Sequence, residues 1–320
     1  MEESMNPTPH EINKAAQALK NGYLVAFPTE TVYGLGADAT NEKAVSRVYS
    51  VKARPTDHPL IVHISSINQL EKWAIDIPEY AIKLAEEFWP GPMTLILKRN
   101  EIAKDFITGG QENVGVRIPS HSVALALLSE FERLGGLGAA APSANRFGAV
   151  SPTSTEAVKG EISEYLKLED LILDGGHPQI GIESSIIDCT DSNPKILRLG
   201  AITQEMIVAS TGLTTTVTNK ANNIRVSGSM KRHYSPKAQL VMSSHASVGE
   251  GFLALSSEPT PAGSVRLASP NSVNEFAQQM YAAIRKGDSL GLKKIIVCPP
   301  EGNGIASAIR DRLTRASAKE

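Results

Sequence analysis

The sequence predicts an α/β protein with a mixed sheet and flanking helices, followed by a second, smaller α/β unit. Short apolar runs typical of strands alternate with helical patterns through residues 1–210. Two strand-like runs within residues 185–199 have no helix between them, which indicates some antiparallel pairing. Residues 211–238 are weak in apolar periodicity, and strand and helix patterns return over 239–320. We therefore expect a larger domain at 1–210, a linker at 211–238 and a small α/β domain at 239–320.

The first helix has clear start and stop signals. Thr8 can cap it, Pro9 suits its first position and Glu11 completes a capping box. The pattern runs to about Lys20 and stops at 21–22, where Asn and Gly favour a helix end.

A loop with glycines follows the first strand. The strand is expected at 23–27, the loop at 28–36, and a helix capped by Asn41 then reaches Lys52. Loops at the carboxyl ends of strands are where α/β proteins bind ligands. An ordinary strand-to-helix turn remains the alternative.

The alternation continues to the end of the chain. Further strands are expected at 60–64, 93–97, 114–118, 137–141, 171–173, 185–189 and 196–199, and helices at 67–73, 78–89, 123–133 and 203–209. In the small domain, strands are expected at 240–242, 252–255, 265–268 and 294–298, and helices at 272–285 and 304–316.

The predicted linker is basic. No carboxylate occurs between Met206 and Gly249, and this stretch holds Lys220, Arg225, Lys231, Arg232 and Lys237. The whole chain is close to neutral, with 32 Lys and Arg against 34 Asp and Glu. Such a balance argues against a protein that mainly coats nucleic acid or an anionic membrane.

Other bulk features favour a cytoplasmic enzyme. The polar N-terminus lacks a secretory signal pattern, and no apolar run approaches the roughly 20 residues that span a bilayer. Cys189 and Cys298 are far apart and make neither a disulfide framework nor a zinc site. The chain has no GxxxxGK[ST], GxGxxG, HExxH or GxSxG motif, so a covalent mechanism is not indicated.

Two pairs of residues are candidates for binding phosphates. Lys52 and Arg54 are two apart, and in an extended stretch they would point the same way and clamp a polyphosphate. Cations at a helix end are also explained by the helix dipole alone. Ser143 and Asn145 follow a strand and could bond ribose or phosphate oxygens, or could cap a turn.

Two charged or titratable residues interrupt apolar strands. Arg117 lies in VGVRIP and needs an anionic partner, either a core carboxylate or a ligand carboxylate. His63 lies in LIVHI, where a satisfied core histidine is the commoner outcome. Together with Ser184 and Arg198, these features indicate a site with several cations and few acids, suited to an anionic substrate with phosphates.

The motifs also occur in a familiar order. PTETVYGLG, KARP, HPLIVHI, VGVRIP, APSANRFG, GIESSIIDC and ILRLG resemble the YrdC family of L-threonylcarbamoyladenylate synthases. The linker SGSMKRHYSPKAQ and the ending EGNGIASAIRDRLTRA resemble the long two-domain form. The resemblance implies a YrdC-like twisted mixed sheet with flanking helices and a smaller Rossmann-like C-terminal domain.

The resemblance implies a nucleotidyltransferase. It would condense L-threonine, bicarbonate and ATP to threonylcarbamoyl-AMP, releasing pyrophosphate, for modification of the tRNA adenosine next to the anticodon. ATP would be a substrate, Mg²⁺ would bind through the phosphates, and a tRNA-modification complex would take the product. No metal ligand from the protein is implied.

The resemblance also implies roles for individual residues. Lys52 and Arg54 would be catalytic. L-threonine would be held by Thr31, His63, Arg117, Ala141 and Ser184. ATP would be held by Lys52, Arg54, His58, Asn113, Ser143, Asn145, Ser151, Arg198 and Tyr234. His58 stands where the family often has asparagine, and Tyr234 would make the linker a lid. The linker's SGSMKRHYSP departs from the common PGMKYRHYAP but keeps His233, Tyr234 and Pro236.

Two other functions are alternatives. Carbamoyl transfer of the hydrogenase-maturation type needs zinc-finger-like cysteine motifs, which two cysteines cannot supply. An RNA-binding module of YrdC-like fold without adenylate synthesis, which would use a basic concave face, is the alternative from another class. The near-neutral charge and the lack of clustered aromatic residues count against it, and weak RNA binding stays open.

Overall fold

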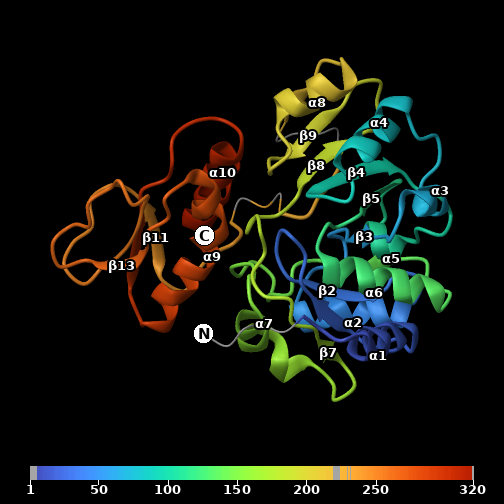
Figure 1. The fold of residues 1–320 in the computed structure, drawn as a ribbon, viewed down its shortest axis with the longest axis horizontal. Helices are drawn as coiled ribbons and strands as arrows, with labels where there is room; N and C mark the ends of the chain where they lie inside the picture. The colour runs from blue at the N-terminus through green and yellow to red at the C-terminus, as the bar shows by residue number, and fades with distance from the viewer. Residues whose placement is uncertain (1–5, 219–223, 229, 231, 319–320) are drawn as a thin grey trace.

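The computed structural model describes residues 6–218, 224–228, 230 and 232–318. Its strands form a ten-stranded sheet and a separate four-stranded sheet. Figure 1 shows the smaller unit, in orange and red, beside the larger one. The boundary between the two units falls in the basic segment, of which residues 219–223, 229 and 231 lie outside the described residues.

 

The strands of the larger sheet are β1 (Val25–Phe27), β2 (Gly34–Asp38), β3 (Ile61–His63), β4 (Met93–Lys98), β5 (Asn113–Arg117), β6 (Ala139–Ala140), β7 (Leu171–Ile172), β8 (Ser185–Asp188), β9 (Lys195–Arg198) and β10 (Thr216–Val217). Its helices are α1 (Pro9–Lys20), α2 (Glu42–Lys52), α3 (Leu70–Trp73), α4 (Glu79–Phe88), α5 (Asp105–Thr108), α6 (Ser122–Arg133), α7 (Thr155–Ile162) and α8 (Gln204–Thr211), with short 3₁₀ turns at Ile67–Gln69 and Ser163–Tyr165. The smaller unit contains β11 (Gln239–Met242), β12 (Gly251–Leu253), β13 (Val265–Ala268), β14 (Lys294–Val297), α9 (Val273–Ser289) and α10 (Ile305–Ser317).

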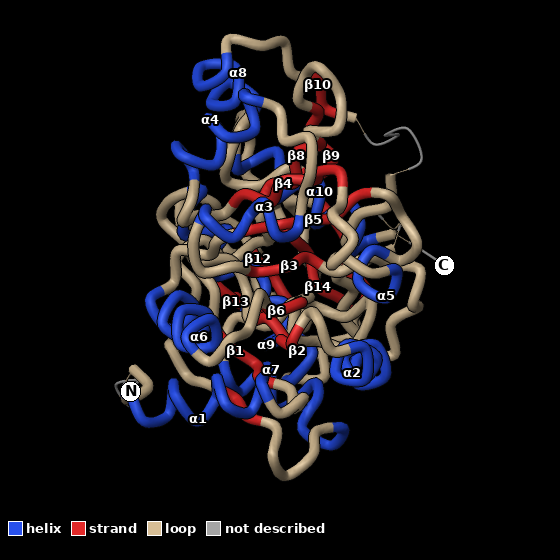
Figure 2. Tube along the Cα trace, turned by 90° about the vertical axis from the view of Figure 1, so that its right-hand side faces the viewer, coloured by secondary structure: helices blue, strands red, loops and turns tan. Residues whose placement is uncertain are grey.

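The larger sheet is mixed, as the sequence predicts. Its order is β10-β9-β8-β4-β5-β3-β6-β2-β1-β7, and parallel pairs such as β3–β5 and β4–β8 alternate with antiparallel pairs such as β4–β5 and β8–β9. The smaller sheet, β11-β14-β12-β13, is parallel throughout. Figure 2 shows the strands running through the middle of the molecule with helices around them. The expected fold class is confirmed.

Local signals explain where most helices begin. The capping box of α1 forms as predicted, with the Thr8 side chain accepting from the Glu11 backbone. Asn41 caps α2 in the same way. The helix α7 was not expected from the sequence, although Ser154 caps it.

The expected loop at 28–36 is wrong in its second half. Gly34 to Gly36 belong to β2 and pair antiparallel with β1. A Cβ on Gly36 would lie 2.7 Å from the Phe27 ring, so the absence of a side chain lets the two strands pack closely. The strand was missed because GLGAD contains no β-branched or aromatic residue.

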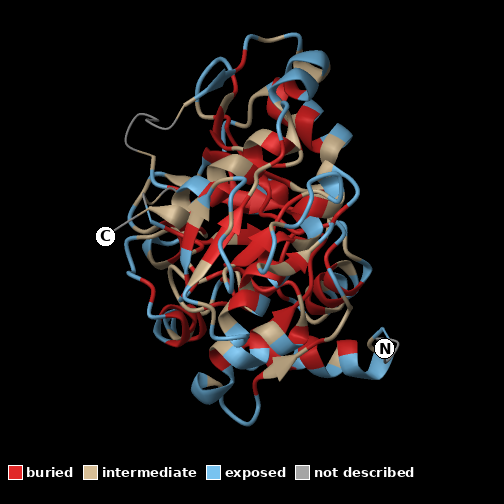
Figure 3. Ribbon diagram, turned by 90° about the vertical axis from the view of Figure 1, so that its left-hand side faces the viewer, coloured by how far each residue is buried: buried red, intermediate tan, exposed pale blue. Residues whose placement is uncertain are grey.

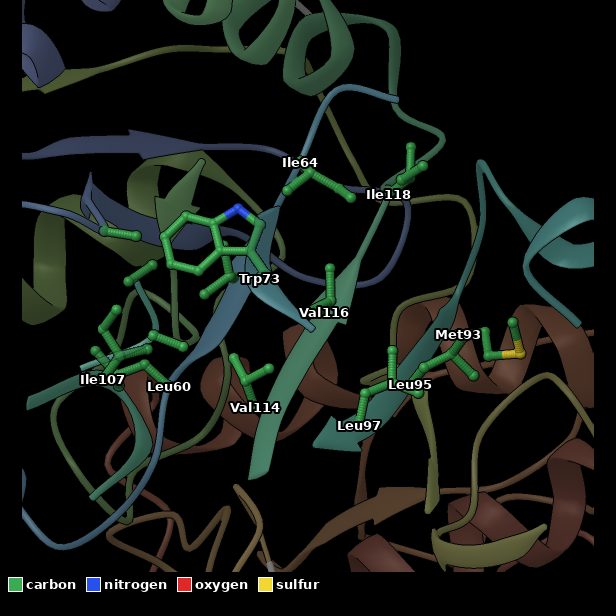
Figure 4. Close-up of a cluster of buried hydrophobic side chains, with 14 of the residues drawn as sticks. Leu60, Ile64, Trp73, Met93, Leu95, Leu97, Ile107, Val114, Val116 and Ile118 are labelled. Carbon is green, nitrogen blue, oxygen red and sulfur yellow. The ribbon is translucent and has the colours of Figure 1, made fainter. Parts of the chain in front are cut away.

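The core of the larger unit lies between the sheet and its helices. Figure 4 shows Trp73 beside Ile64, which follows β3, and Val116 of β5, and Met93, Leu95 and Leu97 of β4 belong to the same cluster. The Trp73 indole donates to the Leu137 carbonyl at 3.1 Å, which satisfies its one buried polar group. Buried residues concentrate along the central strands in Figure 3, whereas the outer helical faces are exposed.

The two units share a buried apolar cluster. Helices α9 and α10 lie between the small sheet and the larger unit (Figure 1). Val32, Val150 and Ile182 of the larger unit belong to the same cluster as Phe276 and Leu313 of these helices. The two units are therefore packed together, and not merely tethered. None of the described helices is long and apolar enough to cross a membrane.

Candidate functional site

A hollow with an empty volume of about 550 Å³ lies where several strands of the larger sheet end. Nine of the predicted site residues line it: Thr31, Arg54, His63, Arg117, Ala141, Ser143, Ser184, Arg198 and Tyr234. The other lining residues are Thr29, Val32, Gly34, Ile61, Pro142, Glu183, Ser227, Gly228 and His233.

Two segments of the wall are joined by backbone hydrogen bonds. Leu35 donates to the Pro142 carbonyl at 2.8 Å, and Ala144 donates to the Tyr33 carbonyl at 2.8 Å. Gly34 also forms an isolated bridge with Ser143. The loop after β1 and the turn after β6 are therefore held as one surface, although they lie more than a hundred residues apart in the sequence.

Arg117 occupies one end of the hollow. Its guanidinium donates to the Glu30 carboxylate at 2.7 Å, to the Thr31 hydroxyl at 3.0 Å and to the Gly91 carbonyl at 3.2 Å. Both side chains of the ion pair are almost fully buried. Of the two anionic partners considered for Arg117, the structure shows a buried carboxylate of the protein, Glu30. The same guanidinium also donates to Thr31.

His63 and Ser184 lie near this end. Burial, followed by the nearby charge of Arg117, lowers the pKa of His63 to about 3, so its imidazole is neutral at physiological pH. The Ser184 hydroxyl lies 2.8 Å from the Thr94 hydroxyl and accepts from Arg198 at 3.0 Å. These neutral groups can bond an amino or hydroxyl group beside a carboxylate.

Arg54 and Arg198 present the other cations of the hollow. Arg54 donates to the carbonyls of His58 and Pro59 and to the Ser227 hydroxyl, and Arg198 donates to the Ser227 carbonyl at 3.0 Å. Among the described residues, neither forms a salt bridge. Burial lowers the pKa of Arg54 to about 10, which an anionic ligand would reverse. Both guanidiniums therefore lack a carboxylate partner among the described residues.

The expected extended stretch at Lys52 and Arg54 is wrong. Lys52 is the last residue of α2, and Ala53 adopts the left-handed conformation, with φ 49° and ψ 41°. The Lys52 ammonium donates to the carbonyls of Ser143 and Asn145 instead of lining the hollow. Burial, then the charge of Arg54, lowers the pKa of Lys52 well below its usual value. Through these bonds, Lys52 holds the turn after β6 in place.

Four other predicted ATP contacts lie outside the wall of this hollow. Ser151 is buried and donates to Glu183 at 2.6 Å. The Asn145 amide donates to the Arg146 and Ala149 carbonyls, and its buried oxygen has no partner among the described residues. The His58 ring packs edge-on against Phe147, and Asn113 begins β5.

Asn113 lines a second, apolar hollow of about 300 Å³. Its walls include Ile61, Ile96, Gly115 and Ile186, and it shares Ile61 and Ser227 with the first hollow. Because Gly115 has no side chain, the aliphatic groups of Ile61, Ile96 and Ile186 bound an apolar slot. Such a slot suits a planar, weakly polar ring.

The described part of the linker lines the first hollow through Ser227, Gly228, His233 and Tyr234. Tyr234 has a positive φ of 62° and is fully buried, and its ring lies 4.1 Å from that of His233. Its hydroxyl is close to Gly228, where an added Cβ would lie 2.3 Å from it. Burial, then the charge of Glu183, raises the pKa of Tyr234 to about 12. Tyr234 is thus a neutral, buried cover.

Glu183 and Thr29 were not selected from the sequence. The Thr29 hydroxyl lies 2.8 Å from that of Thr31, a spacing that the pattern TET could have suggested. Glu183 precedes Ser184, but its strongest partner, Arg312, lies 129 positions away. No local pattern reveals such a pair. Among the described residues, no group of three or more His, Cys, Asp or Glu is placed to hold a metal ion.

Comparisons with known proteins agree along nearly the whole chain. A family model for Sua5, YciO and YrdC, described as telomere recombination, matches residues 17–200. A second model, described as the C-terminal domain of threonylcarbamoyl-AMP synthase, matches residues 202–318.

Named relatives and a solved structure give the same result. A threonylcarbamoyl-AMP synthase of Pyrococcus abyssi is 39% identical over 96% of this chain and 94% of its own. One of Bacillus subtilis is 44% identical over 72% of this chain and 66% of its own. The crystal structure of P. abyssi Sua5 complexed with L-threonine superposes with a TM-score of 0.88, at 36% identity over 98% of this chain and 96% of that one.

Proposed function

Because this chain belongs to the Sua5, YciO and YrdC family, we propose that it is a threonylcarbamoyl-AMP synthase of the two-domain form. It condenses L-threonine, bicarbonate and ATP to threonylcarbamoyl-AMP and releases pyrophosphate, which makes it a nucleotidyltransferase. The relatives that cover most of the chain carry this enzyme name.

The main support for the proposal is the set of guanidiniums that line the hollow. The hollow is lined by Arg117 with Thr31 and by two guanidiniums, Arg54 and Arg198, that form no salt bridge with the described residues. A guanidinium fork matches a carboxylate or a phosphate. The hollow can therefore hold an amino-acid carboxylate and phosphates side by side.

L-threonine is assigned to the Arg117 end. Its carboxylate would receive hydrogen bonds from Arg117 and the Thr31 hydroxyl, in part replacing Glu30. The neutral imidazole of His63 and the hydroxyl of Ser184 would bond its polar groups, with Ala141 contributing backbone. The solved relative named as a complex with L-threonine supports this assignment.

ATP is assigned across the two connected hollows. The purine ring would enter the apolar slot beside Asn113, and the phosphates would reach Arg54, Arg198 and Ser143. Lys52 and Asn145 lie immediately behind Ser143, where a small movement of the turn after β6 would bring them to the phosphates. His58, Ser151 and Tyr234 complete the proposed ATP contacts.

The reaction needs no protein nucleophile. The threonine amine and bicarbonate give a carbamate with loss of water, and a carbamate oxygen then attacks the α-phosphorus while pyrophosphate leaves. Lys52 and Arg54 stabilise the charge that develops on the phosphates. Mg²⁺ enters the proposal only as the counter-ion of ATP, since the described residues offer no cage for it.

The product defines the wider role that we propose. A mixed carbamate–phosphate anhydride is reactive in water, so a tRNA-modification complex that transfers the threonylcarbamoyl group to the adenosine next to the anticodon would have to receive it. We propose that the synthesis of threonylcarbamoyl-AMP takes place in the cytoplasm. The basic linker would at most add weak RNA binding.

Mass spectrometry of reaction products tests the proposal. The purified chain is incubated with ATP, bicarbonate and L-threonine, and threonylcarbamoyl-AMP should appear together with pyrophosphate. Omission of threonine should abolish both. A salt-dependent RNA shift in a chain that releases no pyrophosphate would instead support the RNA-binding alternative.

A further inference from the structure

Glu183 is a buried carboxylate of the larger unit that is held mainly by the smaller one. The Arg312 guanidinium, on α10, donates to it at 2.8 Å, and the Tyr281 hydroxyl, on α9, lies 3.0 Å and 3.2 Å from its two oxygens. Ser151 adds a third donor from the larger unit. The Arg312 side chain is 1% exposed and that of Glu183 is 8% exposed.

These contacts keep Glu183 ionised. Burial alone would raise the pKa of its carboxyl, but the charges of Arg312 and Arg198 and the hydrogen bonds outweigh it, so the pKa is lowered. Removing one partner would leave a buried charge without compensation. The position of Glu183 therefore depends on Arg312 and Tyr281.

Glu183 connects these residues to the substrate hollow. It lines the hollow itself, and the next residue, Ser184, is a proposed threonine contact. Arg198 donates to both the carbonyl and the hydroxyl of Ser184, at 2.9 Å and 3.0 Å. A shift of Glu183 would move Ser184 and disturb its bonds with Arg198.

Arg312 makes a second connection to the site. It donates to the Leu199 carbonyl at 2.7 Å, one residue beyond Arg198, and its guanidinium carbon lies 5.5 Å from the centre of the Tyr234 ring. The Tyr281 ring lies 5.8 Å from that of Tyr234. The same two residues thus support the cover of the hollow as well as its wall.

Building on the proposed function, we propose that Arg312 and Tyr281 are positioning residues for the synthase reaction. They touch no substrate. Through Glu183 they fix Ser184 in the threonine site, and through their contacts with the Tyr234 ring they fix the cover. The smaller unit then contributes to the active site through these two side chains.

Kinetics of the full chain distinguish positioning from simple structural support. Tyr281→Phe removes one hydroxyl and keeps the ring, Arg312→Lys keeps the charge without the fork, and Arg312→Met removes both. Arg310→Met is the matched control, because Arg310 lies on the same helix and its side chain, among the described residues, bonds the Pro300 and Gly302 carbonyls and the Ser307 hydroxyl.

Positioning predicts a higher KM for L-threonine in the folded enzyme. We expect a rise of about fivefold to tenfold for Tyr281→Phe, a loss of at least tenfold in kcat/KM for Arg312→Met, and partial rescue by Arg312→Lys. Arg310→Met should behave like the parent. A purely structural role would reduce the active fraction, and hence kcat, without changing KM.

Two different results would refute two different claims. A parent chain that makes threonylcarbamoyl-AMP while Tyr281→Phe retains the parental KM for threonine would overturn the positioning role alone. A parent chain that makes no adenylate would overturn the proposed function on which it rests. If Arg312→Met does not fold, Tyr281→Phe decides.

Discussion

Arg54 carries a guanidinium whose pKa is lowered by burial. Its guanidinium lies in the wall of the hollow with carbonyl and hydroxyl partners, and the described residues give it no salt bridge. Its lowered pKa reflects the loss of water around the charge. An arriving phosphate would supply the missing negative charge.

Replacing Arg54 with alanine should therefore abolish most activity. We expect pyrophosphate release to fall by roughly 10²- to 10³-fold, the usual effect of removing a group that stabilises transition-state charge. Arg133→Ala, on the exposed face of α6, is the control. Turnover within threefold of the parent, with unchanged circular dichroism, would contradict the role of Arg54.

Arg117 should act on threonine and not on ATP. Lysine at this position keeps the charge opposite Glu30 but cannot also bond Thr31 and Gly91 in the same geometry. We expect Arg117→Lys to raise the KM for L-threonine by roughly 10- to 100-fold and to leave the KM for ATP within threefold.

A second arginine provides a matched comparison for that substitution. Arg47 forms a two-point ion pair with Asp170 and does not line the hollow. Arg47→Lys should leave both KM values unchanged. A larger effect of Arg117→Lys on ATP than on threonine would show that the carboxylate assignment is wrong.

At the scale of elements, the conformation of the linker beside Tyr234 requires a glycine at position 228. Gly228 has φ +82°, and a Cβ there would lie 2.3 Å from the Tyr234 hydroxyl. Gly228→Ala should both strain the backbone and displace the ring that covers the hollow. We expect nucleotide and product to dissociate at least several times faster.

Stopped-flow measurement of product release tests that expectation. Gly212→Ala is a useful control, because its φ is also positive, at +69°, while no atom lies within 4 Å of the added Cβ. It carries the backbone strain without the clash. Equal release rates in the parent and Gly228→Ala would contradict the predicted role of Tyr234 as a lid.

The elements also show how far sequence patterns reach. The capping box of α1 and the mixed pairing around β8 were predictable, because each depends on neighbouring residues. The strand β2 was missed because its glycines serve close packing against Phe27, a contact that local propensity does not encode. The Glu183–Arg312 pair was missed because it depends on how two units pack.

Some residues of the candidate site could likewise be predicted from local patterns, and others could not. Patterns that place a charged residue in an apolar strand identified Arg117 and His63, and the structure places both at the hollow. The direction in which Lys52 points could not be predicted, since it depends on the left-handed conformation of Ala53. The assigned roles of these residues stay predictions, as do the domain boundaries.

At the scale of the whole molecule, two buried histidines link stability to pH. Burial is the main cause that lowers the pKa of both His63 and His233 to about 3. The unfolded chain, with an ordinary histidine pKa of about 6.5, binds more protons between these values. Stability is therefore fully present above about pH 6.5 and falls as the pH drops below it.

Urea unfolding between pH 5 and 8 measures this effect. Each histidine should contribute a slope of up to about 1.4 kcal/mol per pH unit on the acid side. His63→Gln and His233→Gln should each flatten the curve there, and exposed His245→Gln controls for the substitution itself. An acid limb that is identical in the parent and both buried-site variants would disprove the linkage.

The pair formed by Glu183 and Arg312 has a consequence for how such chains can be recombined. The two sheets look like exchangeable modules, yet an acid in one unit is neutralised by a base in the other. A chimera that joined this larger unit to a foreign partner without that base would inherit an uncompensated charge beside its threonine site. Positions 183 and 312 should therefore be transplanted, or replaced by a neutral pair, together.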